Sequence, residues 1–179
     1  MEVYLIRHTT PKIEKNICYG QSDIPLAATF EDEWNVIKQK LPSRIDRIFT
    51  SPLSRCNELS KKVSNHFKVS AAKDSRLMEM NFGEWEMKRW DELDQKDLTI
   101  WMNAYLSRSC PGGESYNDVK LRLRKFIFEN IQDDLSYLIV THGGIIKCFH
   151  GLVTNTHGMD LAIGYGETYH FNGAILFYT

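Results

Sequence analysis

The chain lacks the long apolar runs and paired cysteines that mark membrane-spanning and disulfide-rich proteins. Within its 179 residues no apolar stretch approaches the ~20 residues that a membrane helix needs. The four cysteines form no C-x-x-C pair and match no zinc-ligand spacing, so we expect reduced thiols and no metal site. The first residues lead into a short apolar run without a basic segment, so we expect no signal peptide and a cytoplasmic protein.

The chain also lacks an excess of charge of either sign. It has 22 Lys and Arg against 23 Asp and Glu, which gives a formal net charge of −1. Because no general basic field is present, we expect no nucleic-acid or membrane partner, and any anion site must be built locally. A homodimer through sheet edges or exposed aromatic residues is compatible with the sequence, which carries no specific sign of one.

The remaining pattern indicates one α/β domain over residues 1–179, since there is no repeat, linker or low-complexity tract and 42% of the residues are hydrophobic. Apolar periodicity predicts strands and helices in alternation. We expect strands over 2–6, 45–50, 69–72 and 137–141, helices over 30–40, 52–67, 90–107, 114–131 and 145–153, and a closing hairpin over 168–178. This order predicts a three-layer sandwich with a mostly parallel central sheet and helices on both faces. The helical segment around 90–131 is expected to be an insertion that forms one wall of the site.

Two short segments each place a histidine at the end of an apolar, β-branched run. They are residues 5–9 (LIRHT) and 140–144 (VTHGG). Ligands of α/β proteins bind beyond the carboxyl ends of parallel strands, so we expect His8 and His142 to face one pocket. Arg7 adds a guanidinium group, which matches phosphate geometry. Gly143 and Gly144 permit close backbone approach and left-handed dihedral angles, and a plain strand-to-helix turn is an equally compatible interpretation.

A third segment supplies a second candidate anion ligand, Arg55. Ser51 and Pro52 predict a helix start, because serine caps helices and proline suits the first helical position. Arg55 would then lie in the first turn, beside free backbone N–H groups where an anion is stabilised. A solvated helix arginine is an equally compatible interpretation.

A candidate proton donor lies in residues 76–86 (RLMEMNFGEWE), which contain Glu79, Glu84 and Glu86. Glu79 stands between two methionines, and apolar surroundings favour the uncharged form of a carboxyl group. An uncharged carboxyl group can act as a general acid. Spacing alone does not choose Glu79 over Glu84.

These segments together resemble the histidine phosphatase superfamily, which has the phosphoglycerate-mutase-like fold. The resemblance covers nearly the whole chain and rests on residues 7–9 (RHT), 50–56 (TSPLSRC), 77–86 (LMEMNFGEWE), 111–115 (PGGES) and 141–144 (THGG). Within the superfamily, residues 18–26 (CYGQSDIPL) and the short length are most similar to the α-ribazole phosphatase subfamily.

The chain departs from the superfamily pattern at a few positions. Thr9 and Met87 stand where glycine is usual, Glu14 where asparagine is frequent, and Tyr19 where glutamine often precedes the glycine. These positions lie outside the phosphate-binding set, so they bear on the choice of substrate.

The resemblance implies a metal-independent phosphomonoesterase that needs no cofactor. His8 would be the nucleophile that forms a phosphohistidine, and Glu79 the general acid and base. Arg7, Arg55, His142 and Gly143 would bind the phosphoryl group.

The resemblance also implies a substrate, α-ribazole 5′-phosphate or adenosylcobalamin 5′-phosphate of cobalamin biosynthesis. Tyr19, Gln21 and Trp85 would then contact the substrate at the rim, with Trp101 and Tyr105 as further stacking surfaces. The alternatives are a broad-specificity small-molecule phosphatase, a phosphoglycerate mutase-like enzyme, and a phosphate-recognition module without turnover. Hydrolysis of p-nitrophenyl phosphate separates the enzymes from the binding module.

Overall fold

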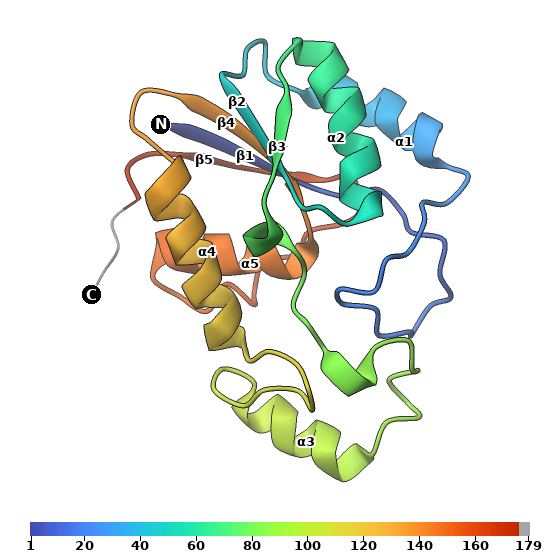
Figure 1. The fold of residues 1–179 in the computed structure, drawn as a ribbon. Helices are drawn as coiled ribbons and strands as arrows, with labels where there is room; N and C mark the ends of the chain where they lie inside the picture. Colours follow the sequence, from blue (N-terminus) through green and yellow to red (C-terminus); the bar gives the residue numbers. More distant parts are fainter. Residues whose placement is uncertain (176–179) are drawn as a thin grey trace.

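The computed structural model describes residues 1–175, which are built around one five-stranded sheet (Figure 1). Its spatial order is β3-β2-β4-β1-β5. The strands are β1 (Glu2–Arg7), β2 (Arg47–Thr50), β3 (Ala71–Lys73), β4 (Ser136–Thr141) and β5 (Thr168–Asn172). The first four are joined by parallel pairing, and β5 runs antiparallel to β1. The expected mostly parallel sheet is therefore confirmed.

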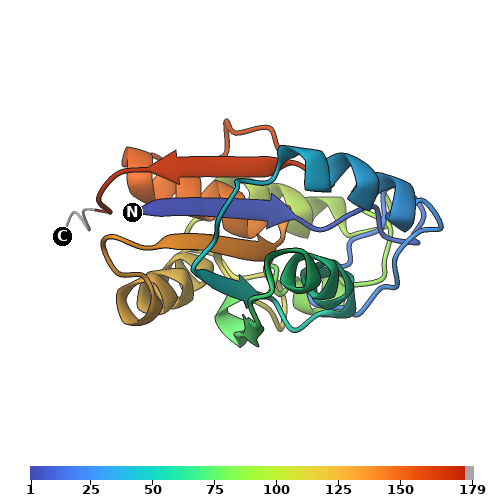
Figure 2. The same cartoon turned by 90° about the horizontal axis from the view of Figure 1, so that it is seen from above.

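The helices cover both faces of this sheet. They are α1 (Phe30–Ile37), α2 (Ser54–Phe67), α3 (Gln95–Ala104), α4 (Tyr116–Asn130) and α5 (Gly143–Thr154), with short 3₁₀ turns η1 (Lys38–Lys40), η2 (Ser75–Leu77) and η3 (Gly83–Trp85). Figure 1 shows α1 and α2 on one side of the sheet and α4 and α5 on the other. Seen from above, β5, β1 and β4 lie side by side between these layers (Figure 2). This is the expected three-layer sandwich.

The two cores follow from the alternation of side chains along the central strands. In β4, Ile139 belongs to the cluster under α4 and α5, whereas its neighbours Leu138 and Val140 belong to the cluster under α1 and α2. Strands that are buried on both faces need continuous apolar runs, which is why residues 137–140 carry no charge. On α2, Cys56, Leu59 and Val63 form the buried stripe at steps of three and four.

The start of α2 differs from the expectation. The helix begins at Ser54, and Leu53 is its N-cap without a side-chain hydrogen bond. Ser51 lies three residues before the helix, and its hydroxyl group accepts a hydrogen bond from the Leu53 amide (3.4 Å) and lies 2.8 Å from His142 Nε2. Arg55 still lies in the first turn of α2, as the sequence predicts.

The start of α5 also differs. The helix begins at Gly143, with His142 as its N-cap, and neither Gly143 nor Gly144 has a positive φ. Both glycines belong to the first helical turn, so the structure has the plain strand-to-helix turn and does not use the left-handed conformation that glycine permits. What they provide is close approach: a Cβ atom on Gly144 would overlap Glu79 Oε1, and one on Gly143 would lie 3.3 Å from Arg7 Nε.

The segment 90–131 divides into α3 and α4, which have different roles. Figure 1 shows α3 at the end of the molecule away from the sheet, and this helix contains no buried residue. In contrast, α4 buries Leu123 and Phe126 in the core and starts with a capping box between Ser115 and Asp118.

Two further expectations concern the cysteines and the closing hairpin. All four cysteines are buried and unpaired. The second hairpin strand, expected over 174–178, lies mostly outside the described residues, and β5 pairs with β1. No helix within residues 1–175 combines the length and the apolar character needed to cross a membrane.

Candidate active site

The ends of β1 and β4 bring two histidines together. Arg7 ends β1 and pairs in register with Thr141, which ends β4. His8 and His142 follow directly, and their ring centroids lie 5.2 Å apart. The parallel register therefore explains why residues 134 positions apart in the chain meet at one edge of the sheet.

Arg55 reaches the same edge from the first turn of α2. Its side chain is fully buried, and its Nη1 and Nη2 atoms donate to the carbonyl groups of Ser22 (2.8 Å) and Gly20 (2.6 Å). The Tyr19 ring lies 5.1 Å from the guanidinium carbon. The Nε atom of Arg55 has no hydrogen-bond partner within residues 1–175. One donor of this buried guanidinium group thus remains for a ligand.

Arg7 has a similar environment on the other side of His8. Its Nη1 atom donates to the carbonyl of Ile163 (2.7 Å), and the Tyr165 ring lies 3.9 Å from its guanidinium carbon. Its buried Nε atom also has no partner in the described part of the chain. Neither Arg7 nor Arg55 forms an ion pair with a carboxylate there. Two guanidinium groups without counter-charges make an environment that favours an anion.

His8 is held in the form that a nucleophile needs. It is 1% exposed, and burial, followed by the charge of Arg55 and then that of Arg7, lowers its pKa from 6.5 to about 3, against the opposing effect of the Thr9 carbonyl. The imidazole is therefore neutral at pH 7. Its Nδ1 atom lies 2.8 Å from that carbonyl oxygen, which can only accept, so Nδ1 carries the proton. Nε2 is left with a free lone pair.

His142 is fully buried beside His8. Burial, and then the neighbouring His8 and Arg55, lower its pKa well below the usual value, so this ring is also neutral at pH 7. Its Nε2 atom lies 2.8 Å from Ser51 Oγ and 3.4 Å from Cys56 Sγ. These contacts fix the ring orientation at the N-terminus of α5.

Glu79 lies against the first turn of α5. Its Oε2 atom accepts a hydrogen bond from the Gly144 amide (3.1 Å), and Oε1 accepts one from the Met80 amide (3.0 Å). The absence of a Cβ atom on Gly144 permits this approach. A carboxyl group is therefore fixed next to the segment that follows His142.

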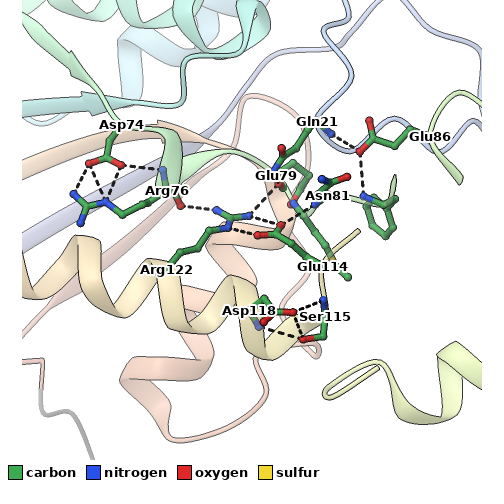
Figure 3. Close-up of polar contacts among 12 residues, drawn as sticks. Gln21, Asp74, Arg76, Glu79, Asn81, Glu86, Glu114, Ser115, Asp118 and Arg122 are labelled. Carbon is green, nitrogen blue, oxygen red and sulfur yellow. Dashed lines mark hydrogen bonds and ion pairs between the residues drawn. The ribbon is translucent and has the colours of Figure 1, made fainter. Parts of the chain in front are cut away.

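The backbone that carries Glu79 is anchored by Arg122 of α4. Figure 3 shows this guanidinium group between the carbonyl of Arg76, the carbonyl of Glu79 and the carboxylate of Glu114. Gln21 donates to the same Glu79 carbonyl from the opposite side (2.9 Å). These bonds fix the backbone of Glu79, while its carboxyl group is held by the amides of Gly144 and Met80.

The other two glutamates of the segment have different surroundings. Glu86 accepts hydrogen bonds from the amides of Gln21, Ser22 and Phe82, so it holds the loop that carries the Arg55 partners. Glu84 is exposed. Of the three, Glu79 is the one at the site.

A cavity of about 340 Å³ is lined by Arg7, Glu79, Gly143 and Gly144 of this site, whereas the buried His8, Arg55 and His142 do not line it. Its charged residues within the described chain are Arg7, Glu79 and Lys147. The other walls include Gly143 and Gly144 and a mainly apolar set of side chains: Met80, Phe82, Trp101, Tyr105, Tyr116, Val119, Met159 and Ile163. The cavity can hold an apolar or aromatic group next to the two glycines.

The three residues expected at the rim, Tyr19, Gln21 and Trp85, have different surroundings. Tyr19 stacks on Arg55, and Gln21 supports Glu79. Trp85 is buried, packs edge-on against Trp101 with 5.4 Å between ring centroids, and does not line the cavity.

Sequence reasoning missed Tyr165, Lys147 and the role of Ser51 beside His142. The Tyr165 ring lies 5.5 Å from the His8 ring, and its hydroxyl group lies 2.9 Å from that of Tyr19. A glycine on each side of Tyr165 was its only local signal.

Comparison with known proteins identifies the family. The sequence pattern of the histidine phosphatase superfamily (branch 1) matches residues 3–165. The protein named "Putative phosphoserine phosphatase 2" of Hydrogenobacter thermophilus is 30% identical over 159 residues, 85% of this chain and 78% of the relative. The adenosylcobalamin/alpha-ribazole phosphatase of Escherichia coli is 26% identical over 154 residues, 82% of this chain and 76% of the relative.

A solved structure supports the fold assignment. YhfR of Bacillus stearothermophilus superposes with a TM-score of 0.84 at 24% identity, covering 99% of this chain and 94% of that one. The match of the family pattern spans both histidine segments, Arg55 and Glu79. The chain therefore belongs to the histidine phosphatase superfamily, branch 1.

Proposed function

We propose that the protein is a metal-independent phosphomonoesterase that works through a phosphohistidine on His8. The observation that carries the proposal is a buried, neutral His8 with a free Nε2 lone pair, between Arg7 and Arg55, which have no carboxylate partner among residues 1–175. A neutral imidazole can attack phosphorus, and two fixed cations can bind the phosphoryl oxygens.

In the first half of the reaction, His8 Nε2 attacks the phosphorus atom. The bond from phosphorus to the ester oxygen breaks, and Glu79 in its acid form gives its proton to the leaving alkoxide. Arg7, Arg55 and His142 donate to the nonbridging oxygens, where the negative charge is spread in the transition state. The amide of Gly143, at the N-terminus of α5, adds a further donor.

In the second half, water attacks the phosphohistidine. Glu79, now a carboxylate, accepts a proton from this water molecule while the bond between phosphorus and His8 Nε2 breaks. Inorganic phosphate leaves, and His8 and Glu79 return to their starting forms. The positive charge needed at the phosphoryl group comes from side chains, so the scheme uses no metal ion.

For the substrate we propose first α-ribazole 5′-phosphate or adenosylcobalamin 5′-phosphate. The base of α-ribazole is flat and apolar, and Trp101, Tyr105 and Phe82 offer aromatic surfaces along the cavity. The name of the Escherichia coli relative gives the same substrate class. On this proposal the protein acts in cobalamin biosynthesis.

A second candidate is a phosphomonoester with an acidic group on its alcohol, such as phosphoserine. Lys147 lines the cavity and could pair with a carboxylate there. The name of the Hydrogenobacter relative points to such an ester.

Phosphate release in excess EDTA tests the proposal. The panel contains α-ribazole 5′-phosphate, phosphoserine, 3-phosphoglycerate, sugar phosphates, nucleotides and p-nitrophenyl phosphate, each with wild-type protein and with His8→Ala. We expect turnover that EDTA leaves intact and that His8→Ala abolishes. Isomerisation of 3-phosphoglycerate without phosphate release would instead indicate a mutase, and no reaction with any ester would indicate a binding module.

A further inference from the structure

Lys147 is the charged residue of the cavity for which the proposed reaction has no use. It lines the cavity together with Arg7 and Glu79 and is half-buried. Within residues 1–175 its ammonium group makes no hydrogen bond or ion pair. A lysine in this environment has lost part of its hydration without gaining a counter-charge.

In the proposed reaction the phosphoryl group binds at Arg7, and α5 places Lys147 further along the same cavity. Lys147 follows Gly143 by four residues and Gly144 by three, so it lies on the same face of α5 as each glycine. All three residues line the cavity. Lys147 lies one helical turn, about 5 Å along the axis, beyond the glycines that adjoin Arg7 and Glu79. Its neighbours in the cavity wall, Met159 and Ile163, are apolar.

The charged residues that line the cavity indicate which substrates it would bind. Arg7 is assigned to the phosphoryl group, and the carboxyl group of Glu79 is assigned to proton transfer. Apart from Glu79, the described cavity wall contains no acidic group that Lys147 could face. Apolar walls strengthen charge pairing relative to water.

We infer that Lys147 selects phosphomonoesters whose alcohol carries a carboxylate or another anionic group. The inference rests on the proposed phosphatase function and narrows its substrate class. At equal size, an anionic alcohol is preferred to a neutral one, and a neutral one to a cationic one. The inference favours the second candidate substrate over α-ribazole 5′-phosphate, whose alcohol is neutral.

Two aryl phosphates that differ only in the para substituent test the inference. The kcat/KM for para-carboxyphenyl phosphate is divided by that for para-tolyl phosphate, which removes effects common to both esters. Substituting Lys147→Met should lower this ratio about tenfold, and Lys147→Glu should lower it further, because an ion pair is lost and then replaced by repulsion. The turnover of para-tolyl phosphate should change little. Lys40→Glu, an exposed lysine outside the cavity, makes the same change in net charge and should leave the ratio unaltered.

The outcomes distinguish a failure of the Lys147 inference from a failure of the proposed phosphatase function. An unchanged ratio in both Lys147 variants, with normal turnover of para-tolyl phosphate, would overturn the inference and leave the phosphatase proposal standing. Equal losses of ratio in Lys147→Glu and Lys40→Glu would also overturn it, since a general field would then be the cause. Absence of turnover by the wild-type protein on both esters would overturn the proposed function and this inference with it.

Discussion

Acidification should destabilise the protein through His8, at a pH where Asp46 remains charged. Burial, and then the charges of Arg55 and Arg7, lower the His8 pKa from 6.5 to about 3 in the folded state. Between these values the unfolded chain binds a proton that the folded protein does not bind. The free energy of unfolding therefore falls as the pH is lowered through this window.

The size of the effect follows from the window. A pH of 5 lies about 1.5 units below the pKa of His8 in the unfolded chain, and each unit corresponds to about 1.4 kcal/mol. Protonation of His8 should therefore lower the free energy of unfolding by about 2 kcal/mol between pH 7.5 and pH 5. His142 adds a loss of the same sign, because its pKa is also lowered, first by burial. Asp46, whose pKa is about 2 because Ser136 and then Arg44 hydrogen bond to it, titrates below this window.

Denaturant unfolding of wild type and His8→Gln at pH 7.5 and pH 5 measures the effect. The variant should lose about 2 kcal/mol less between the two pH values than the wild type does, because it lacks the titrating group. His157→Gln, which removes an exposed imidazole, is the matched control for the change in composition. The same pH dependence in wild type and His8→Gln would refute the assignment of a buried, neutral His8.

Three further predictions concern the groups around His8. Glu79→Gln should lower kcat on alkyl phosphates by about 10²- to 10⁴-fold, because the proton donor is lost. The inhibition constant of inorganic phosphate should change little. An unchanged kcat would remove Glu79 from the mechanism. Arg55→Lys should raise the inhibition constant of phosphate by about tenfold or more, because one ammonium group cannot hold the carbonyls of Gly20 and Ser22 and also face an anion; phosphate binding at wild-type strength would contradict this role. Gly144→Ala should lower kcat by about 10²-fold in a folded protein, since its Cβ atom would displace the Glu79 carboxyl group; circular dichroism checks the fold, and wild-type kcat would show that this placement of Glu79 is not needed.

The sequence predicted the positions that depend on strand ends. His8 and His142 each follow an apolar run that is too short for a helix and too apolar for a loop. Once both runs are taken as parallel strands, their histidines must emerge at the same edge of the sheet. The same reasoning predicted the position of Arg55, because this residue lies in the first turn of α2 whether the helix begins at residue 52 or at Ser54.

The prediction of Glu79 rested on its two methionine neighbours and on the family resemblance, because spacing alone did not choose it over Glu84. The hydrogen bond from the Gly144 amide to Glu79 joins segments 65 residues apart, and no local rule predicts it.

Ser51 and Trp85 lie in other surroundings than the local sequence predicts, because tertiary contacts use their side chains. Ser51 has the chemistry of a helix cap, but its hydroxyl group is used by His142. Trp85 has the chemistry of a stacking surface, but it is enclosed by other aromatic rings and packs against Trp101. Lys147 and Tyr165 could not be singled out because their importance comes only from what the fold places around them.

The account depends most directly on a covalent bond between phosphorus and His8. Rapid mixing of the protein with a radiolabelled phosphomonoester, followed by an alkaline quench and peptide mapping, measures this bond. We expect label on the peptide that contains His8 in wild-type protein, more of it in Glu79→Gln if hydrolysis is slowed most, and none in His8→Ala. Steady turnover without label on His8, or turnover by His8→Ala at the wild-type rate, would contradict the account.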